Sequence, residues 1–123
     1  MSSVHISRWT LLSGLAFVFA YFGIDKFVHP SLWIGWMPAW LDGQWSLTLN
    51  QWLDVTAVAE IIIAAALLFP VTIVQRIAAF FAAAHLTAVL TQTGWNDVAV
   101  RDIGLLMMAT GLWYLLKDER IVK

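Results

Sequence analysis

Long apolar stretches alternate with short polar segments along this chain. A helix that crosses a bilayer needs about 20 mostly apolar residues, because each residue adds about 1.5 Å and the hydrocarbon core is about 30 Å thick. Four stretches satisfy this requirement, at residues 9–28, 50–69, 72–93 and 98–116. Helices satisfy their own backbone hydrogen bonds in lipid, and short connections bring successive helices together. The pattern therefore predicts an all-α, four-helix transmembrane bundle, with residues 1–123 forming a single transmembrane domain.

The segment at residues 31–41, between the first two spans, is apolar but too short to cross a membrane. Trp33, Trp36 and Trp40 recur at the spacing of one helix face, and Pro38 interrupts the segment. Indole rings favour the headgroup layer, where an apolar body and one N–H are both satisfied. We therefore predict a short interfacial helix that anchors the loop, and the alternative role for this helix is a lid over a ligand pocket.

The composition agrees with a membrane protein and excludes several other classes. Apolar residues make up 61% of the chain and charged residues 12%, whereas soluble domains have about 45–50% and about 25%. Seven Lys and Arg residues against eight Asp and Glu residues provide no basic surface, so we expect a lipid bilayer as partner and no nucleic acid. The chain has no cysteine, so it supplies neither a disulfide nor a thiolate.

The distribution of basic residues predicts the orientation of the bundle. Four spans place both termini and the turn near Pro70 on one side of the membrane. That side carries five basic residues, and the opposite side carries only Lys26 and Arg101. Because cytoplasmic loops are enriched in Lys and Arg, we expect a multi-pass protein of the cell membrane with both termini in the cytoplasm. The five residues are Arg8, Arg76, Lys117, Arg120 and Lys123.

Polar side chains inside the predicted spans are the candidates for a functional site. An ionisable residue at the centre of a span costs about 2.5–3.5 kcal/mol on insertion, so such residues normally face the bundle interior. All four spans contribute such groups, and all of the groups lie in the half away from the termini. We therefore predict a polar pocket that opens outward above an apolar plug. Its candidate residues are Asp25, Lys26, Asp54, Glu60, His85, Gln92, Arg101 and Asp102.

Glu60 and His85 are the deepest of these residues and the candidate catalytic pair, because buried carboxyl and imidazole groups can transfer protons near neutral pH. We expect Glu60 to form an ion pair with a cation from the first or the fourth span, either Lys26 or Arg101. Structural alternatives stay open. Lys26 and Arg101 can reach the headgroups, Asp54 can complement the helix dipole, and His85 can be a hydrogen-bonded core residue.

No metal site is expected. The three histidines, His5, His29 and His85, fall in separate regions, and no helix carries two histidines at ligand spacing. A haem with two histidine ligands would need both at one level of the membrane, and only His29 and His85 share the outer half.

Several short motifs resemble those of the DoxX-like (DoxX/DoxD) family of small four-span membrane proteins. They are the run FAYFGIDKF at residues 19–27 followed by His29 and Pro30, the second span around Glu60, and the run NDVAVRDIGL at residues 96–105. The resemblance covers essentially the whole chain. Some members of that family are membrane subunits of a thiosulfate:quinone oxidoreductase, and others are associated with sulfur transfer or oxidative stress. The resemblance implies that Lys26, Glu60, Arg101 and Asp102 are the family's polar set.

Two functions follow from this resemblance and from the predicted pocket. The first is a subunit of a quinone-linked or sulfur-linked redox system, in which the pocket holds a small anion such as thiosulfate or hydrogen-bonds the head group of a quinone, the candidate cofactor. A partner protein supplies any thiol. Aromatic side chains at Phe17, Phe19, Phe22 and Trp52 would flank the quinone head group. The alternative is a non-catalytic membrane anchor or assembly factor. A homo-oligomer is a further expectation, because Gly104 and Gly111 share one helix face and can mark a close helix contact within the bundle or between subunits.

Overall fold

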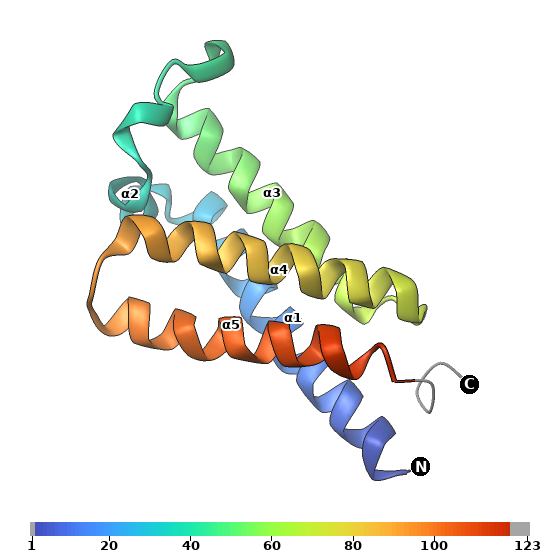
Figure 1. Cartoon of the computed structure of the whole chain (residues 1–123). Coiled ribbons are helices and arrows are strands. Elements are labelled where there is room, and N and C mark those ends of the chain that lie inside the picture. The colour runs from blue at the N-terminus through green and yellow to red at the C-terminus, as the bar shows by residue number, and fades with distance from the viewer. Residues whose placement is uncertain (1, 119–123) are drawn as a thin grey trace.

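The structure is a computed structural model that describes residues 2–118, and these residues form four long helices with short helical turns between the first two. Each long helix is long and apolar enough to cross a membrane, which confirms the predicted all-α, multi-pass architecture (Figure 1). The long helices are α1 (Ser3–Val28), α3 (Leu49–Leu68), α4 (Thr72–Thr93) and α5 (Asp97–Leu115). The short ones are α2 (Pro30–Trp33), η1 (Ile34–Trp36), η2 (Ala39–Leu41) and η3 (Gln44–Ser46).

The helix ends follow local capping chemistry. The first helix begins at Ser3 rather than at residue 9, because the Ser2 side chain accepts a hydrogen bond from the His5 backbone and caps a polar first turn. Thr48 and Gln51 form a reciprocal capping box at the start of α3. Asn96 caps α5 by accepting a hydrogen bond from the Ala99 backbone at 2.9 Å. The apolar pattern thus predicted the spans, and polar caps set their ends.

The connection between α1 and α3 has the predicted interrupted helical form. Pro30 occupies the first turn of α2, where its missing N–H removes no helical hydrogen bond. The helix continues through η1 and breaks at Met37 and Pro38, which are extended. The segment packs against α1 and α3. Figure 1 shows that this segment lies at the end of the bundle away from the termini.

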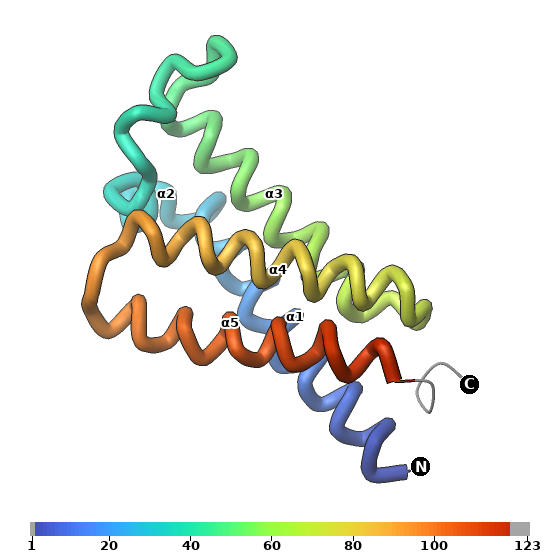
Figure 2. Tube along the Cα trace, in the orientation of Figure 1, coloured from blue at the N-terminus to red at the C-terminus, as the bar shows by residue number. Residues whose placement is uncertain are grey.

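The four long helices form two pairs. α1 packs along α3, α4 packs along α5, and the pairs meet through α3 with α4 and α1 with α5. The first pair crosses the second obliquely (Figure 2). The first turn of α1, the last turn of α5 and the turn between α3 and α4 lie at one end, whereas α2 and the turn between α4 and α5 lie at the other (Figure 1). Both described ends of the chain are thus on the same side of the bundle.

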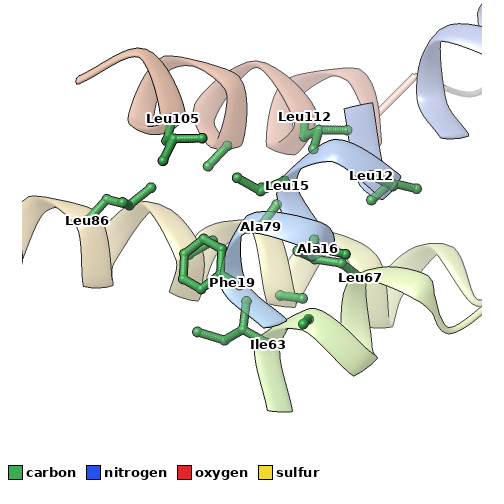
Figure 3. Packing of buried hydrophobic residues seen from close by; sticks show 14 residues of the cluster. Leu12, Leu15, Ala16, Phe19, Ile63, Leu67, Ala79, Leu86, Leu105 and Leu112 are labelled. Atoms are coloured by element: carbon green, nitrogen blue, oxygen red, sulfur yellow. The ribbon is translucent and has the colours of Figure 1, made fainter. Parts of the chain in front are cut away.

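The hydrophobic core lies in the middle of the bundle, and Figure 3 shows how its side chains pack between the helices. Leu12, Leu15 and Phe19 of α1 project into it, and small alanines on α4 allow the neighbouring helices to approach closely. This core lies between the termini and the polar residues of the opposite half. That is the position predicted for the apolar plug. The buried core residues are Leu12, Leu15, Ala16, Phe19, Ile63, Ala64, Leu67, Ala78, Ala79, Ala82, Leu86, Leu105, Ala109 and Leu112.

Of the two helix contacts that Gly104 and Gly111 could mark, the one within the bundle is not formed. A Cβ atom at either position would meet nothing within 4 Å. The buried face of α5 instead passes through Leu105, Ala109 and Leu112. Both glycines are therefore exposed on the outer side of α5.

Candidate functional site

A cavity of about 430 Å³ lies in the half of the bundle away from the termini, and we call it the polar pocket. All four long helices and the segment at residues 32–41 line it. Seven of the eight predicted polar residues line the cavity, so the structure brings nearly the whole predicted set together. These seven residues are Asp25, Lys26, Glu60, His85, Gln92, Arg101 and Asp102.

Glu60 is the centre of the polar pocket's charged cluster. Its side chain is buried, with 3% of the residue exposed, and it lies between two cationic or titratable groups. The Lys26 Nζ atom donates a hydrogen bond to Glu60 Oε1, and His85 Nε2 lies 3.7 Å from Glu60 Oε2. The expected ion pair of Glu60 is therefore confirmed, with the cation from the first span. Three helices meet at one carboxylate.

A close approach of two helix backbones beside this cluster brings Lys26 within reach of Glu60. A Cβ atom at Gly23 would lie 2.9 Å from the Ala57 carbonyl oxygen and 2.7 Å from Ile61 Cγ1. Gly23 precedes Lys26 by three residues, and Ala57 precedes Glu60 by three residues, so each glycine or alanine shares a helix face with its charged neighbour. Gly23 thus allows α1 and α3 to pack at the distance that the ion pair requires.

Arg101 and Asp102 form a second charge pair on the wall of the pocket. The Nε and Nη2 atoms of Arg101 donate to Asp102 Oδ1 at 3.1 and 3.0 Å. The guanidinium also lies 4.5 Å from the centre of the Phe22 ring, within the range of a cation–π contact. Each of the two predicted pocket cations, Lys26 and Arg101, therefore faces a carboxylate, and these pairs add no net charge.

The segment at residues 30–36 covers one side of the pocket through Trp33. Asp25 Oδ2 accepts a hydrogen bond from Trp33 Nε1 at 2.7 Å, and Asp25 Oδ1 lies 2.8 Å from His29 Nδ1. The Trp33 ring centre in turn lies 4.3 Å from Lys26 Nζ and 5.3 Å from the Phe22 ring centre. Asp25 thus holds a tryptophan over the Lys26 ammonium. The segment at residues 30–36 thus forms part of the pocket wall, as the lid alternative requires.

Asp54 lies outside the polar pocket, so its prediction as a pocket residue is wrong. It is exposed on α3. At about 100° per residue, Asp54 lies about 120° around the helix from Glu60, which is six residues further on.

Two of the four aromatic residues predicted to flank a quinone head group also lie outside the pocket lining. Phe17 is 71% exposed and lies two residues from the buried Phe19, and Trp52 donates its Nε1–H to the Gln44 carbonyl in the loop.

The remaining predicted residues lie in the pocket with more modest contacts. The His85 ring lies 5.9 Å from the Phe19 ring, at a tilted angle of 57°. Gln92 lines the cavity and donates from Nε2 to Thr91 Oγ1 at 3.3 Å. Across residues 2–118, no three histidine, aspartate or glutamate side chains are grouped as metal ligands would be.

A second buried polar group, which the sequence analysis did not identify, lies near the termini. Arg8 donates from Nη2 to Gln75 Oε1 at 2.6 Å and to Thr72 Oγ1 at 3.1 Å, and its Nε donates to the same Gln75 oxygen at 3.1 Å. Arg8 and Gln75 are both buried. Arg8 was expected only as a boundary cation. The signal that could have revealed this group is a glutamine at helical spacing from a threonine, in the otherwise apolar start of the third span.

Comparisons with known proteins place the chain in a family. No curated protein and no solved structure matches it. One family, described as a domain of unknown function (DUF8561), matches residues 15–102. The matched region includes every residue of the charged cluster, from Lys26 through Glu60 and His85 to Asp102. Because the match covers well over half of the 123 residues, the chain belongs to the DUF8561 family.

Proposed function

We propose that this protein binds a quinone head group in the polar pocket and is a membrane subunit of a quinone-linked redox system. The observation that carries the proposal is a cavity of about 430 Å³ that combines the Lys26–Glu60–His85 cluster with aromatic and aliphatic walls. Pockets for small molecules are typically about 300–1,000 Å³, mostly apolar, with a few convergent polar groups. The resemblance to DoxX-like proteins, which stays a prediction, implies the same function.

The pairing of charges favours a neutral head group over a small anion such as thiosulfate. Lys26 contacts Glu60, and Arg101 contacts Asp102, so neither cation is left without a carboxylate. An anion would compete with a carboxylate for each of them, whereas a quinone carbonyl needs only a hydrogen-bond donor. Phe19, Phe22 and Trp33 line the same cavity and provide the flat apolar surfaces that an aromatic head group contacts.

The residues of the pocket suit the handling of protons. Reduction of a bound quinone to the quinol would take up two electrons and two protons. His85 lines the cavity, and its Nε2 atom lies 3.7 Å from Glu60 Oε2, so a proton held on His85 faces a carboxylate. Lys26 holds the other oxygen of that carboxylate and fixes its orientation toward His85. The reaction also needs an electron donor, which we assign to a redox partner protein. Because the chain has no cysteine, any thiol chemistry would belong to that partner as well.

Purified protein in detergent should be stabilised by a short-chain quinone. A ligand that binds only the native state raises its stability in proportion to the logarithm of concentration above Kd, so we expect Tm to rise steadily with added benzoquinone or naphthoquinone analogues. His85→Leu, which removes a polar group of the pocket, should reduce this rise. Asp54→Asn is the matched control and should keep it.

Two outcomes would count against the quinone proposal. The first is an unchanged Tm with every quinone analogue. The second is an equal rise with farnesol, which has an isoprenoid chain but no quinone ring. Stoichiometric copurification of a partner protein together with either outcome would favour the anchor or assembly role.

We also propose that both ends of the chain face the cytoplasm, because the end of the bundle that holds them carries Arg8, Arg76 and Lys117. A cysteine-free chain allows a direct check with single introduced cysteines. In intact cells, Ser46→Cys in the loop before α3 should react with a membrane-impermeant maleimide, and Ser2→Cys should react only after lysis. The reverse labelling pattern would show that the two ends of the chain face away from the cytoplasm and would contradict the proposal.

A further inference from the structure

A second site lies at the opposite end of the bundle, where two cations flank one tryptophan. The Arg76 guanidinium carbon lies 4.7 Å from the centre of the Trp113 ring, and Lys117 Nζ lies 3.8 Å from it. Arg76 is in the first turns of α4, and Lys117 follows the last turn of α5. Both cations are therefore near the end of the bundle where the described part of the chain begins and ends (Figure 1).

The positive charge of this cluster is not neutralised by a carboxylate within residues 2–118. Neither Arg76 nor Lys117 forms an ion pair in that part of the chain. The Arg76 Nε atom is buried and has no hydrogen-bond partner among the same residues. Arg76 as a residue is half-buried, so an external acceptor would contact the other N–H donors of its guanidinium and not the covered Nε atom.

An apolar groove runs from Arg76 toward the middle of the bundle. It has a volume of about 320 Å³, and Arg76 and Trp113 lie in its lining together with four large apolar residues of α4. Phe80 and Phe81 lie about one turn further along α4 than Arg76, so the groove leads away from the charged end. The four apolar residues are Ile73, Ile77, Phe80 and Phe81.

We propose that this groove binds an anionic phospholipid, with its phosphate at Arg76 and Lys117 and an acyl chain along Phe80 and Phe81. Phosphate is a strong acceptor for guanidinium donors, and basic pockets between helices at the cytoplasmic side bind anionic headgroups. Charge complementarity selects among lipids. A zwitterionic headgroup brings its own ammonium group toward two cations, whereas an anionic headgroup does not. The apolar walls select a lipid over free phosphate.

Native mass spectrometry of the full chain with mixed lipids tests this site. We expect phosphatidylglycerol to be retained in preference to phosphatidylcholine. The double variant Arg76→Gln/Lys117→Gln should bind phosphatidylglycerol more weakly, by about fivefold for each cation removed. The control variant Arg120→Gln/Lys123→Gln changes the net charge equally but keeps both cations that flank Trp113, so it should weaken binding less. Glycerol phosphate, which has the headgroup without acyl chains, should fail to compete.

Several outcomes would overturn the lipid site. They are equal retention of both phospholipids, equal weakening in the two double variants, and effective competition by glycerol phosphate. The first and third need only the wild-type chain, so they apply even if a variant fails to fold. Phe81→Ala keeps both cations and should still weaken phosphatidylglycerol binding, because it removes part of the groove wall. Quinone stabilisation should be unchanged in all these variants, which separates this site from the polar pocket.

Discussion

Glu60→Gln should lower the free energy of unfolding by about 3–5 kcal/mol, because it leaves the buried Lys26 ammonium without its counter-ion. Lys26 and Glu60 are 8% and 3% exposed, so water compensates little for the lost charge. Gln keeps the size of Glu and a hydrogen-bonding oxygen, and the change therefore isolates the charge. Reversible unfolding in mixed detergent micelles measures the effect.

A double variant and a surface variant serve as controls for the ion pair. Lys26→Met/Glu60→Leu removes both charges with little change in volume, and such replacements are often neutral or stabilising, so most of the loss should disappear. Asp54→Asn removes an exposed carboxylate from the same helix and should change stability by less than about 0.5 kcal/mol. Equal losses in Glu60→Gln and Asp54→Asn would show that the ion pair does not stabilise the bundle.

The number of spans could be predicted from the sequence because the bilayer fixes the length of an apolar helix. The predicted span at residues 72–93 coincides with α4, where Pro70 before it and Gly94 after it mark both ends. The start of α1 could not be predicted in the same way. Residues 3–8 are largely polar or basic, and only the Ser2 cap shows that the helix extends through them.

The set of pocket residues could be predicted because polar groups in a membrane avoid lipid and gather together. Their partners could not, because the partners depend on helix rotation and on distances between helices. Lys26 and Arg101 were equally good candidates for the ion pair with Glu60, because both were expected in the same half of the bundle. Arg101 instead contacts its neighbour Asp102. The close approach of α1 to α3 brings Lys26 to the carboxylate.

Glycine spacing was a poor guide to this approach. Gly104 and Gly111 have the regular spacing of a helix contact, but their positions face outward. No second glycine lies at helical spacing from Gly23 on α1. Gly23 is nevertheless the one among the seven glycines at which an added Cβ atom would lie within 3 Å of a neighbouring atom. A small residue indicates that a close approach is possible, and only the packing of the other helix determines whether it occurs.

Gly23→Ala should therefore destabilise the bundle by about 1–3 kcal/mol, the range for an added group in a tightly packed interior. The new methyl group would lie 2.9 Å from the Ala57 carbonyl oxygen. That oxygen belongs to the backbone of α3 and cannot move without the helix. The shift would also lengthen the Lys26–Glu60 contact three residues away, so the loss should be coupled to that of Glu60→Gln in a double-mutant cycle.

Gly104→Ala makes the same chemical change where a Cβ atom meets nothing within 4 Å. Alanine favours a helix over glycine by about 0.5–1 kcal/mol, so this variant should be slightly more stable than the wild type. The opposite signs at two helical glycines separate the close approach of α1 to α3 from helix propensity. If both variants gain stability in the same unfolding experiment, α1 and α3 are not in contact at Gly23, and the ion pair loses its structural support.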